Sequence, residues 1–171
     1  MSSFVIYCSK YGSTKTYAEK LAKDLNWEAL SYKGFPKNDL MNCDSLVLAS
    51  NIRMGKMGIR KWARSNSSLI LPKCKAILAV GGTESKNQDY YYDAVEKNLA
   101  FLKLKKEQII GLGGRQFVSE YKGFDAFVFK LMAKMIKDSK LKEQILKDKD
   151  HMDLKLLDPI IKLLKNEEDH A

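Results

Sequence analysis

Short apolar stretches alternate with stretches of helical periodicity along most of the chain. The predicted strands cover residues 4–7, 27–32, 46–49, 76–80 and 108–112. After the first of them, Tyr17, Ala18, Leu21, Ala22 and Leu25 recur at the spacing of one helix face. Apolar strands that are each followed by a helix are typical of a parallel sheet covered by helices on both faces. The pattern therefore predicts an α/β fold with a doubly wound, five-stranded parallel sheet.

Polar loops follow three of these predicted strands. The loops cover residues 9–15, 50–55 and 81–83. In an open parallel sheet, ligands bind outside the carboxyl ends of the strands, where the strand order reverses. We therefore expect the three loops to converge on one ligand site. Gly81 and Gly82 would let backbone amides approach a flat ligand closely.

The first loop is rich in hydroxyl groups and leads directly into a helix. Ser9, Ser13 and Thr14 can donate hydrogen bonds to phosphate oxygens. The first N–H groups of the helix have no partner within the helix and favour an anion. The loop therefore predicts a phosphate site, although it matches neither GxxxxGK[ST] nor GxGxxG. The alternative is a plain strand–turn–helix unit in which Ser13 or Thr14 is the N-cap.

The chain from about residue 115 to 150 is expected to form a basic amphipathic insertion within a single domain covering residues 1–171. Apolar residues at the spacing of one helix face are Phe124, Phe127, Val128, Leu131, Met132, Met135 and Ile136. Lys130, Lys134 and Lys137 would form the opposite face. The helix could pack on the core, lie on anionic lipid, or bind nucleic acid, which no accompanying motif supports. A last helix over residues 154–164 would have Pro159 either as a break or in its first turn.

The formal net charge of +9 favours anionic partners. Cys8, Cys43 and Cys74 are scattered and fit a reducing cytoplasm, with neither a disulfide framework nor a metal site. No apolar run approaches the roughly 20 residues that span a bilayer, and the start of the chain lacks a signal-peptide pattern. We therefore expect a cytoplasmic protein with no metal and no nucleic-acid partner. No hydrolytic constellation stands out, so any chemistry would be carried by a cofactor.

Residues 9–14, SKYGST, resemble the flavodoxin phosphate loop, [ST]-x-[TY]-G-x-T. The resemblance implies the flavodoxin-like fold and FMN, with its phosphate in this loop and its ring between the two other loops. Met54 or Ile52 would pack against the ring, and Arg53 would interact with the ring edge or with a substrate carboxylate. Tyr90, Tyr91 and Tyr92 would flank the ring or pack their own helix. The implied cofactor-binding residues are Ser9, Lys10, Tyr11, Gly12, Ser13, Thr14, Lys15, Asn51, Ile52, Arg53, Met54, Gly55, Gly81, Gly82 and Thr83.

A narrower resemblance covers residues 113–135. The segments GGRQF, YKGFD and KLMAKM are similar to the menaquinone-dependent protoporphyrinogen oxidases, flavodoxin-fold enzymes of haem biosynthesis. Residues 52–55, IRMG, are similar to the I-R-x-G loop of these enzymes. The resemblance implies oxidation of protoporphyrinogen IX, with electrons passing through FMN to a membrane quinone. Arg115, Tyr121 and Lys122 would contact the substrate or quinone, and the basic insertion would attract porphyrin propionates and the inner face of the cell membrane.

Two alternatives remain open from the sequence. The first is a flavodoxin-type electron carrier that docks a redox partner protein and has no substrate of its own. Soluble carriers of that type are typically acidic, so the charge of +9 favours the enzyme. The second is a flavodoxin-fold protein that binds no flavin and uses its basic face for lipid or partner binding.

Overall fold

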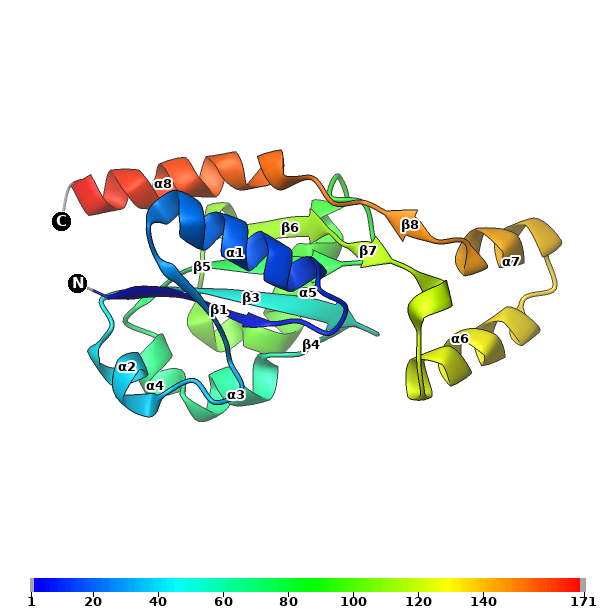
Figure 1. Ribbon diagram of the computed structural model, residues 1–171, viewed down its shortest axis with the longest axis horizontal. Coiled ribbons are helices and arrows are strands. Elements are labelled where there is room, and N and C mark those ends of the chain that lie inside the picture. Colours follow the sequence, from blue (N-terminus) through cyan, green and yellow to red (C-terminus); the bar gives the residue numbers. More distant parts are fainter. Residues whose placement is uncertain (1, 170–171) are drawn as a thin grey trace.

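The computed structural model describes residues 2–169. The fold is organised around a parallel sheet (Figure 1). The strands are β1 (Ser3–Cys8), β2 (Glu28–Ser31), β3 (Ser45–Arg53), β5 (Cys74–Gly81) and β6 (Ile109–Gly113). Their order across the sheet is β2-β1-β3-β5-β6. The winding reverses between β1 and β3, which is the order of the flavodoxin-like fold. The predicted doubly wound parallel sheet is confirmed.

Helices cover both faces of this sheet. Successive strand residues point to opposite faces, so Val5, Val47 and Leu78 pack beneath α1 (Ser13–Leu25) and α8 (Asp158–Asp169). Ile6, Leu48 and Ile77 face the other helices. These helices are α2 (Lys37–Asn42), α3 (Arg60–Ser65), α4 (Ser67–Ile70) and α5 (Gln88–Leu99). Pro159 lies in the first turn of α8 and does not break the helix, which was one of the two alternatives expected.

The third strand is longer than the sequence pattern indicates. Residues 50–55 were expected to form a polar loop, but Ser50 and Asn51 continue the pairing of β3 with β5. The short strand β4 (Lys56–Met57) then pairs antiparallel with the end of β3. Met54 and Gly55 make the turn, with φ values of 49° and 72°. This β3–β4 hairpin places its tip at the carboxyl edge of the sheet.

The basic insertion leaves the sheet after β6 and returns to it. β7 (Arg115–Gln116) pairs antiparallel with β8 (Lys149–Asp150), and the α6–α7 segment, residues 117–148, lies between them. It contains α6 (Phe124–Met135) and α7 (Ser139–Leu146), which extend to one side of the sheet in Figure 1. Short 3₁₀ helices lie at Ala100–Leu102, Lys106–Gln108, Val118–Glu120 and Leu154–Leu157.

The apolar residues predicted to share one face of α6 do not pack on the core. Phe124 is 69% exposed and Met135 is 75% exposed, and Phe127 and Leu131 are exposed as well. Asp125 and Ala133 are the buried residues of this helix. The core-packed interpretation of the helix is therefore wrong for most of its apolar stripe. The reason is that the helix extends beyond the sheet and has only its inner side against the protein.

Among residues 2–169, no helix has the length and apolar character needed to cross a membrane. The same residues contain no cluster of three or more His, Cys, Asp or Glu side chains placed to hold a metal ion.

Candidate functional site

A cavity of about 340 Å³ lies at the carboxyl ends of β3, β5 and β6. This volume is within the range of small-molecule sites. The three loops converge on it as expected, and α6 forms a further wall. The sequence-predicted residues that line it are Tyr11, Ser13, Asn51, Ile52, Arg53, Met54, Gly81, Gly82, Thr83, Arg115 and Tyr121.

Other sequence-predicted residues lie around the cavity without lining it. The Oγ of Ser9 accepts a hydrogen bond from Gly12 N–H at 3.2 Å, which shapes the first loop. Thr14 is buried in the first turn of α1, and Lys15 forms an ion pair with Glu19. Gly55 faces a different cavity. Lys122 is exposed and is not among the lining residues, so the structure does not bring it to the site.

The first loop enters α1 without a side-chain cap. Gly12 is the N-cap, in a left-handed conformation with φ 92° that favours glycine. The alternative in which Ser13 or Thr14 caps the helix is therefore wrong. The first turn carries no acidic residue. The Oγ of Ser13 accepts a hydrogen bond from the backbone N–H of Arg115 at 2.9 Å, which fixes β7 beside the loop.

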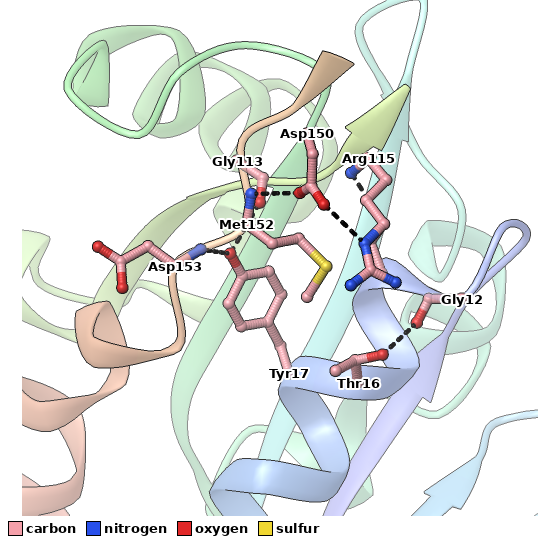
Figure 2. A network of polar contacts seen from close by, with 9 residues as sticks. Gly12, Thr16, Tyr17, Gly113, Arg115, Asp150, Met152 and Asp153 are labelled. Carbon is pink, nitrogen blue, oxygen red and sulfur yellow. Dashed lines mark hydrogen bonds and ion pairs between the residues drawn. The ribbon is translucent and has the colours of Figure 1, made fainter. Parts of the chain in front are cut away.

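A buried tyrosine joins this loop to the ends of the insertion (Figure 2). The Tyr17 hydroxyl donates to the carbonyl of Gly113 at 2.8 Å and accepts from the N–H of Asp153 at 2.9 Å. Burial raises the pKa of Tyr17, so the hydroxyl stays protonated at neutral pH. Arg115 donates from Nε to Asp150 at 3.1 Å, and Figure 2 shows its side chain between Asp150 and the first turn of α1. Arg115 is thereby held at the cavity.

Asp125 brings a carboxylate from α6 into the cavity. It is only 4% exposed and contacts Lys10, the Tyr11 hydroxyl and the Arg53 guanidinium. Burial raises the pKa of Tyr11, so its hydroxyl stays a donor to the carboxylate at neutral pH. Two cations surround one carboxylate, which leaves a local excess of positive charge. This corner of the cavity therefore accepts negative charge, and an acid from the chain itself already occupies it.

The loop after β5 is held close to its neighbours by hydrogen bonds and by small residues. Gly114 N–H donates to the carbonyl of Gly81 at 2.7 Å. A Cβ on Gly82 would lie 2.9 Å from the side-chain oxygen of Gln116, so only glycine fits without a shift. Tyr90 lines the cavity, and Tyr91 is fully buried with its hydroxyl bonded to the carbonyl of Thr83. The tyrosines were expected either to flank the ring or to pack their own helix. Tyr90 has the position for the first role, and Tyr91 has the second.

The wall that α6 contributes was not predicted from the sequence. Val128, Phe129 and Met132 line the cavity together with Asp125 and Gln116. Tyr121 packs edge-on against Phe129, with ring centroids 4.7 Å apart. A signal for Asp125 was present, because it is the one acidic residue in the otherwise apolar and basic stretch 124–136. Val128 and Met132 belong to the predicted apolar stripe, but the spacing does not show which part of the stripe faces the cavity.

Residues 4–142, most of the chain, match the sequence profile of the flavodoxin domain. The chain belongs to the flavodoxin family. A search of curated proteins gave no match. Among solved structures, flavodoxin 2 of Bacillus cereus is similar at 14% identity and a TM-score of 0.50, over 66% of this chain and 84% of that one. At this identity the likeness shows the fold alone.

Two further flavodoxin-fold structures are more distant. A WrbA-like flavodoxin of Agrobacterium tumefaciens has 16% identity and a TM-score of 0.47, over 84% of this chain and 98% of that one. A flavodoxin of Fusobacterium nucleatum, solved with flavin mononucleotide bound, has 19% identity and a TM-score of 0.38, over 57% and 65%.

FMN is the cofactor that membership of the flavodoxin family implies for this site. The residues present fit it on two counts. The hydroxyl-rich first loop leads into a helix without acidic residues in its first turn, which suits a phosphate. Asp125 shows in addition that Lys10, Tyr11 and Arg53 together hold an anion at the same cavity. Ser13, Thr14 and the first N–H groups of α1 would hold the phosphate, and residues 51–54 and 81–83 would face the ring.

Proposed function

We propose that this flavodoxin-family protein is an FMN-dependent oxidoreductase that acts on its own small-molecule substrate. The supporting observation is the position of α6. Val128, Phe129 and Met132 of this helix line the cavity opposite the two ring-side loops. A site walled in this way suits a small substrate better than the direct approach of a protein. The net charge of +9 also favours an anionic substrate over a basic partner surface.

The chain's own residues would bind, orient and shield the reactants. FMN, when bound, supplies the transfer of electrons singly or in pairs. Arg53 and Lys10 stabilise negative charge at one end of the cavity. Val128, Phe129 and Tyr90 exclude water from the other parts of the cavity, which strengthens those electrostatic interactions. No side chain is assigned a covalent step.

The cofactor assignment is tested by the visible absorption spectrum after FMN is added and the excess is removed. We expect flavin to be retained at one equivalent per chain. Ser13→Ala combined with Thr14→Ala should abolish retention, because the hydroxyls at the start of α1 are lost. Ser65→Ala combined with Ser68→Ala, at exposed positions, is the matched control. A colourless wild-type protein would contradict every flavin-dependent function.

We further propose a porphyrinogen as substrate and a quinone as electron acceptor. The resemblance of residues 113–135 to the quinone-linked protoporphyrinogen oxidases supports this. So does the pairing of an apolar wall with two arginines, Arg53 and Arg115, each held in place by an aspartate with further N–H groups left to donate. A large apolar macrocycle bearing carboxylates would match both features.

The substrate proposal is tested by anaerobic oxidation of protoporphyrinogen IX with menadione as acceptor. We expect porphyrin fluorescence to appear only with FMN-loaded protein, and Arg115→Gln to slow its appearance. Lys122→Gln is the matched control, because Lys122 does not line the cavity. Retained flavin without turnover would overturn the porphyrinogen proposal and leave the FMN site intact.

A second candidate function is electron transfer to a redox partner protein. Met54 at the tip of the β3–β4 hairpin favours it, because this side chain lines the cavity and is also 76% exposed. A docking protein would meet it directly. Reduction of the bound flavin in two well-separated one-electron steps would support the carrier. Reduction in a single two-electron step would support the enzyme.

We also propose peripheral contact with an anionic membrane through the α6–α7 segment. Phe124, Phe127, Leu131 and Met135 expose an apolar surface on α6. The exposed lysines of the same segment are Lys122, Lys130, Lys134, Lys137, Lys140, Lys142 and Lys147. Apolar side chains ringed by lysines match the interface of a bilayer that carries acidic headgroups.

Sedimentation with vesicles tests this contact. The protein should co-sediment with vesicles that contain phosphatidylserine and should not co-sediment with vesicles of phosphatidylcholine alone. Phe127→Ser combined with Leu131→Ser should reduce binding, whereas Met41→Ser, at an exposed position beyond this segment, should leave it unchanged. Equal binding by all variants would contradict a role for α6.

A further inference from the structure

A second cavity, of about 390 Å³, lies on the other side of the β3–β4 hairpin from the cofactor cavity. Three elements bring cationic side chains to its wall, namely β4, α3 and α5. The cations are Lys56, Arg60, Lys61, Arg64 and Lys97. No acidic residue lines this cavity. Neither the flavin site nor the proposed membrane contact uses any of these side chains.

These cations lack acidic partners within the described chain. The sequence has four arginines, and two of them are paired, Arg53 with Asp125 and Arg115 with Asp150. Over residues 2–169, Arg60 and Arg64 form no ion pair, and neither do Lys56, Lys61 and Lys97. Five like charges around one cavity repel one another. A bound anion with several charges would relieve that repulsion.

We propose that this cavity binds the phosphate groups of a small phosphorylated molecule, a diphosphate or triphosphate. Arg60 and Arg64 are one helical turn apart on α3, and the planar guanidinium group matches phosphate oxygens with paired hydrogen bonds. Lys97 on α5 and Lys56 on β4 add charge from two other elements. A single carboxylate would leave most of this charge uncompensated. A chain of phosphate groups matches both its number and its spread.

The wall of the cavity is held in place before any ligand arrives. The buried side chain of Asn98 donates to the carbonyls of Gly55 at 2.9 Å and of Ala94 at 2.8 Å, and it accepts from Met57 N–H at 3.2 Å. Arg60 donates from Nη1 to the carbonyl of Met57 at 3.1 Å. The hairpin, α3 and α5 are thereby fixed relative to one another. Such preorganisation lowers the entropic cost of binding.

Calorimetric titration of the FMN-loaded protein with inorganic pyrophosphate and with ADP tests the proposal, because FMN then occupies the phosphate site at the start of α1. The titrations are run at about 0.15 M salt, where exposed charges are screened beyond about 8 Å. Both probes should bind at one site, and orthophosphate should bind at least about tenfold more weakly because it neutralises fewer charges. Arg60→Gln combined with Arg64→Gln should weaken pyrophosphate binding about tenfold or more. Circular dichroism of the variant confirms that it is folded.

The matched control is Lys23→Gln combined with Lys155→Gln, which removes the same net charge at exposed positions outside the cavity. Equal weakening by both double variants would overturn the proposal, because it would show attraction to net charge alone. Absence of pyrophosphate and ADP binding by the wild-type protein would overturn it as well. Flavin retention, read in the same samples, is expected to be unchanged in both variants, so failure here is separate from failure of the flavin site.

Discussion

The sheet and the α6–α7 segment place their apolar side chains in opposite ways. Val5, Leu48 and Ile77 of the sheet are fully buried between two layers of helices. Phe124, Phe127 and Leu131 of α6 are exposed, although their spacing is that of an amphipathic helix. Apolar groups in the core stabilise the fold, since burial removes them from water. These exposed apolar groups of α6 contribute little to folding, and an exposed apolar patch of this kind is typical of a surface that contacts another molecule.

The largest effect is expected when a leucine is replaced by alanine in each of the two regions. Leu48→Ala should lower the free energy of unfolding by about 2–5 kcal/mol, because it opens a cavity in a packed core. Leu131→Ala, at a residue 48% exposed, should change it by less than about 0.5 kcal/mol. Urea denaturation followed by circular dichroism measures both. Similar losses in the two variants would show that α6 is part of the cooperative core.

A second test addresses the point where the two regions meet. Asp125 of α6 contacts Arg53, which lines the cavity, and Lys10 of the first loop. Asp125→Asn should release Lys10 near the phosphate loop and Arg53 near the ring, and should tighten FMN binding about tenfold, a change of about 1.4 kcal/mol. Fluorescence titration with FMN measures the affinity.

The control for this change is Glu120→Gln, which removes the same charge at an exposed position of the same segment. It should leave FMN affinity unchanged. If Asp125→Asn instead weakens FMN binding, then Asp125 helps to form the cofactor site and does not compete for its cations.

The smallest expected effect is acid loosening of the α6–α7 segment alone. A hydrogen bond from the Ser119 hydroxyl lowers the pKa of Asp148, and the backbone N–H of Met152 lowers the pKa of Asp150. A carboxyl whose pKa is lowered by folding contributes stability above its unfolded pKa, here the ordinary value of 3.8. That contribution is lost as the pH falls below this value and through the lowered pKa.

Hydrogen exchange at pH 6 and pH 3, expressed as protection relative to intrinsic rates, measures the loosening. Amides of α6 and α7 should lose protection at pH 3 while those of β1 and β3 keep it. Ser119→Ala should make the loss smaller, because without the Ser119 hydroxyl the pKa of Asp148 is lowered less by folding. Equal loss of protection in the sheet would show global acid unfolding.

The sheet could be predicted from the sequence because its signal is local. Continuous apolar runs such as residues 46–49 and 76–80 mark buried parallel strands wherever they lie in the fold. The hydroxyl-rich loop before α1 was recognised for the same reason, since Ser9, Ser13 and Thr14 are neighbours in the chain. The convergence of three loops followed from the topology of a parallel sheet.

What the sequence did not reveal depends on contacts between distant residues. Asp125 meets Tyr11 across 114 positions of the chain, and no spacing rule connects them. Residues 50–55 were predicted to form a loop, and the β3–β4 hairpin was not predicted, because two-residue strands such as β4 are too short to show alternation. The orientation of α6 was ambiguous, because Val128 and Met132 lie at the edge between its inner and outer sides. Only the position of the helix beyond the sheet decides which side is buried.

The pairing of β7 with β8 has a consequence for how such a protein can change over evolutionary time. The chain leaves the domain at Arg115–Gln116 and re-enters it at Lys149–Asp150, directly alongside. The Tyr17 hydroxyl is hydrogen-bonded to the chain on both sides of this segment, to Gly113 before it and to Asp153 after it. A segment with adjoining ends can be shortened, extended or exchanged in one genetic event without moving a strand of the sheet. The same nucleotide-binding scaffold could in this way acquire a new substrate or a new surface to dock on.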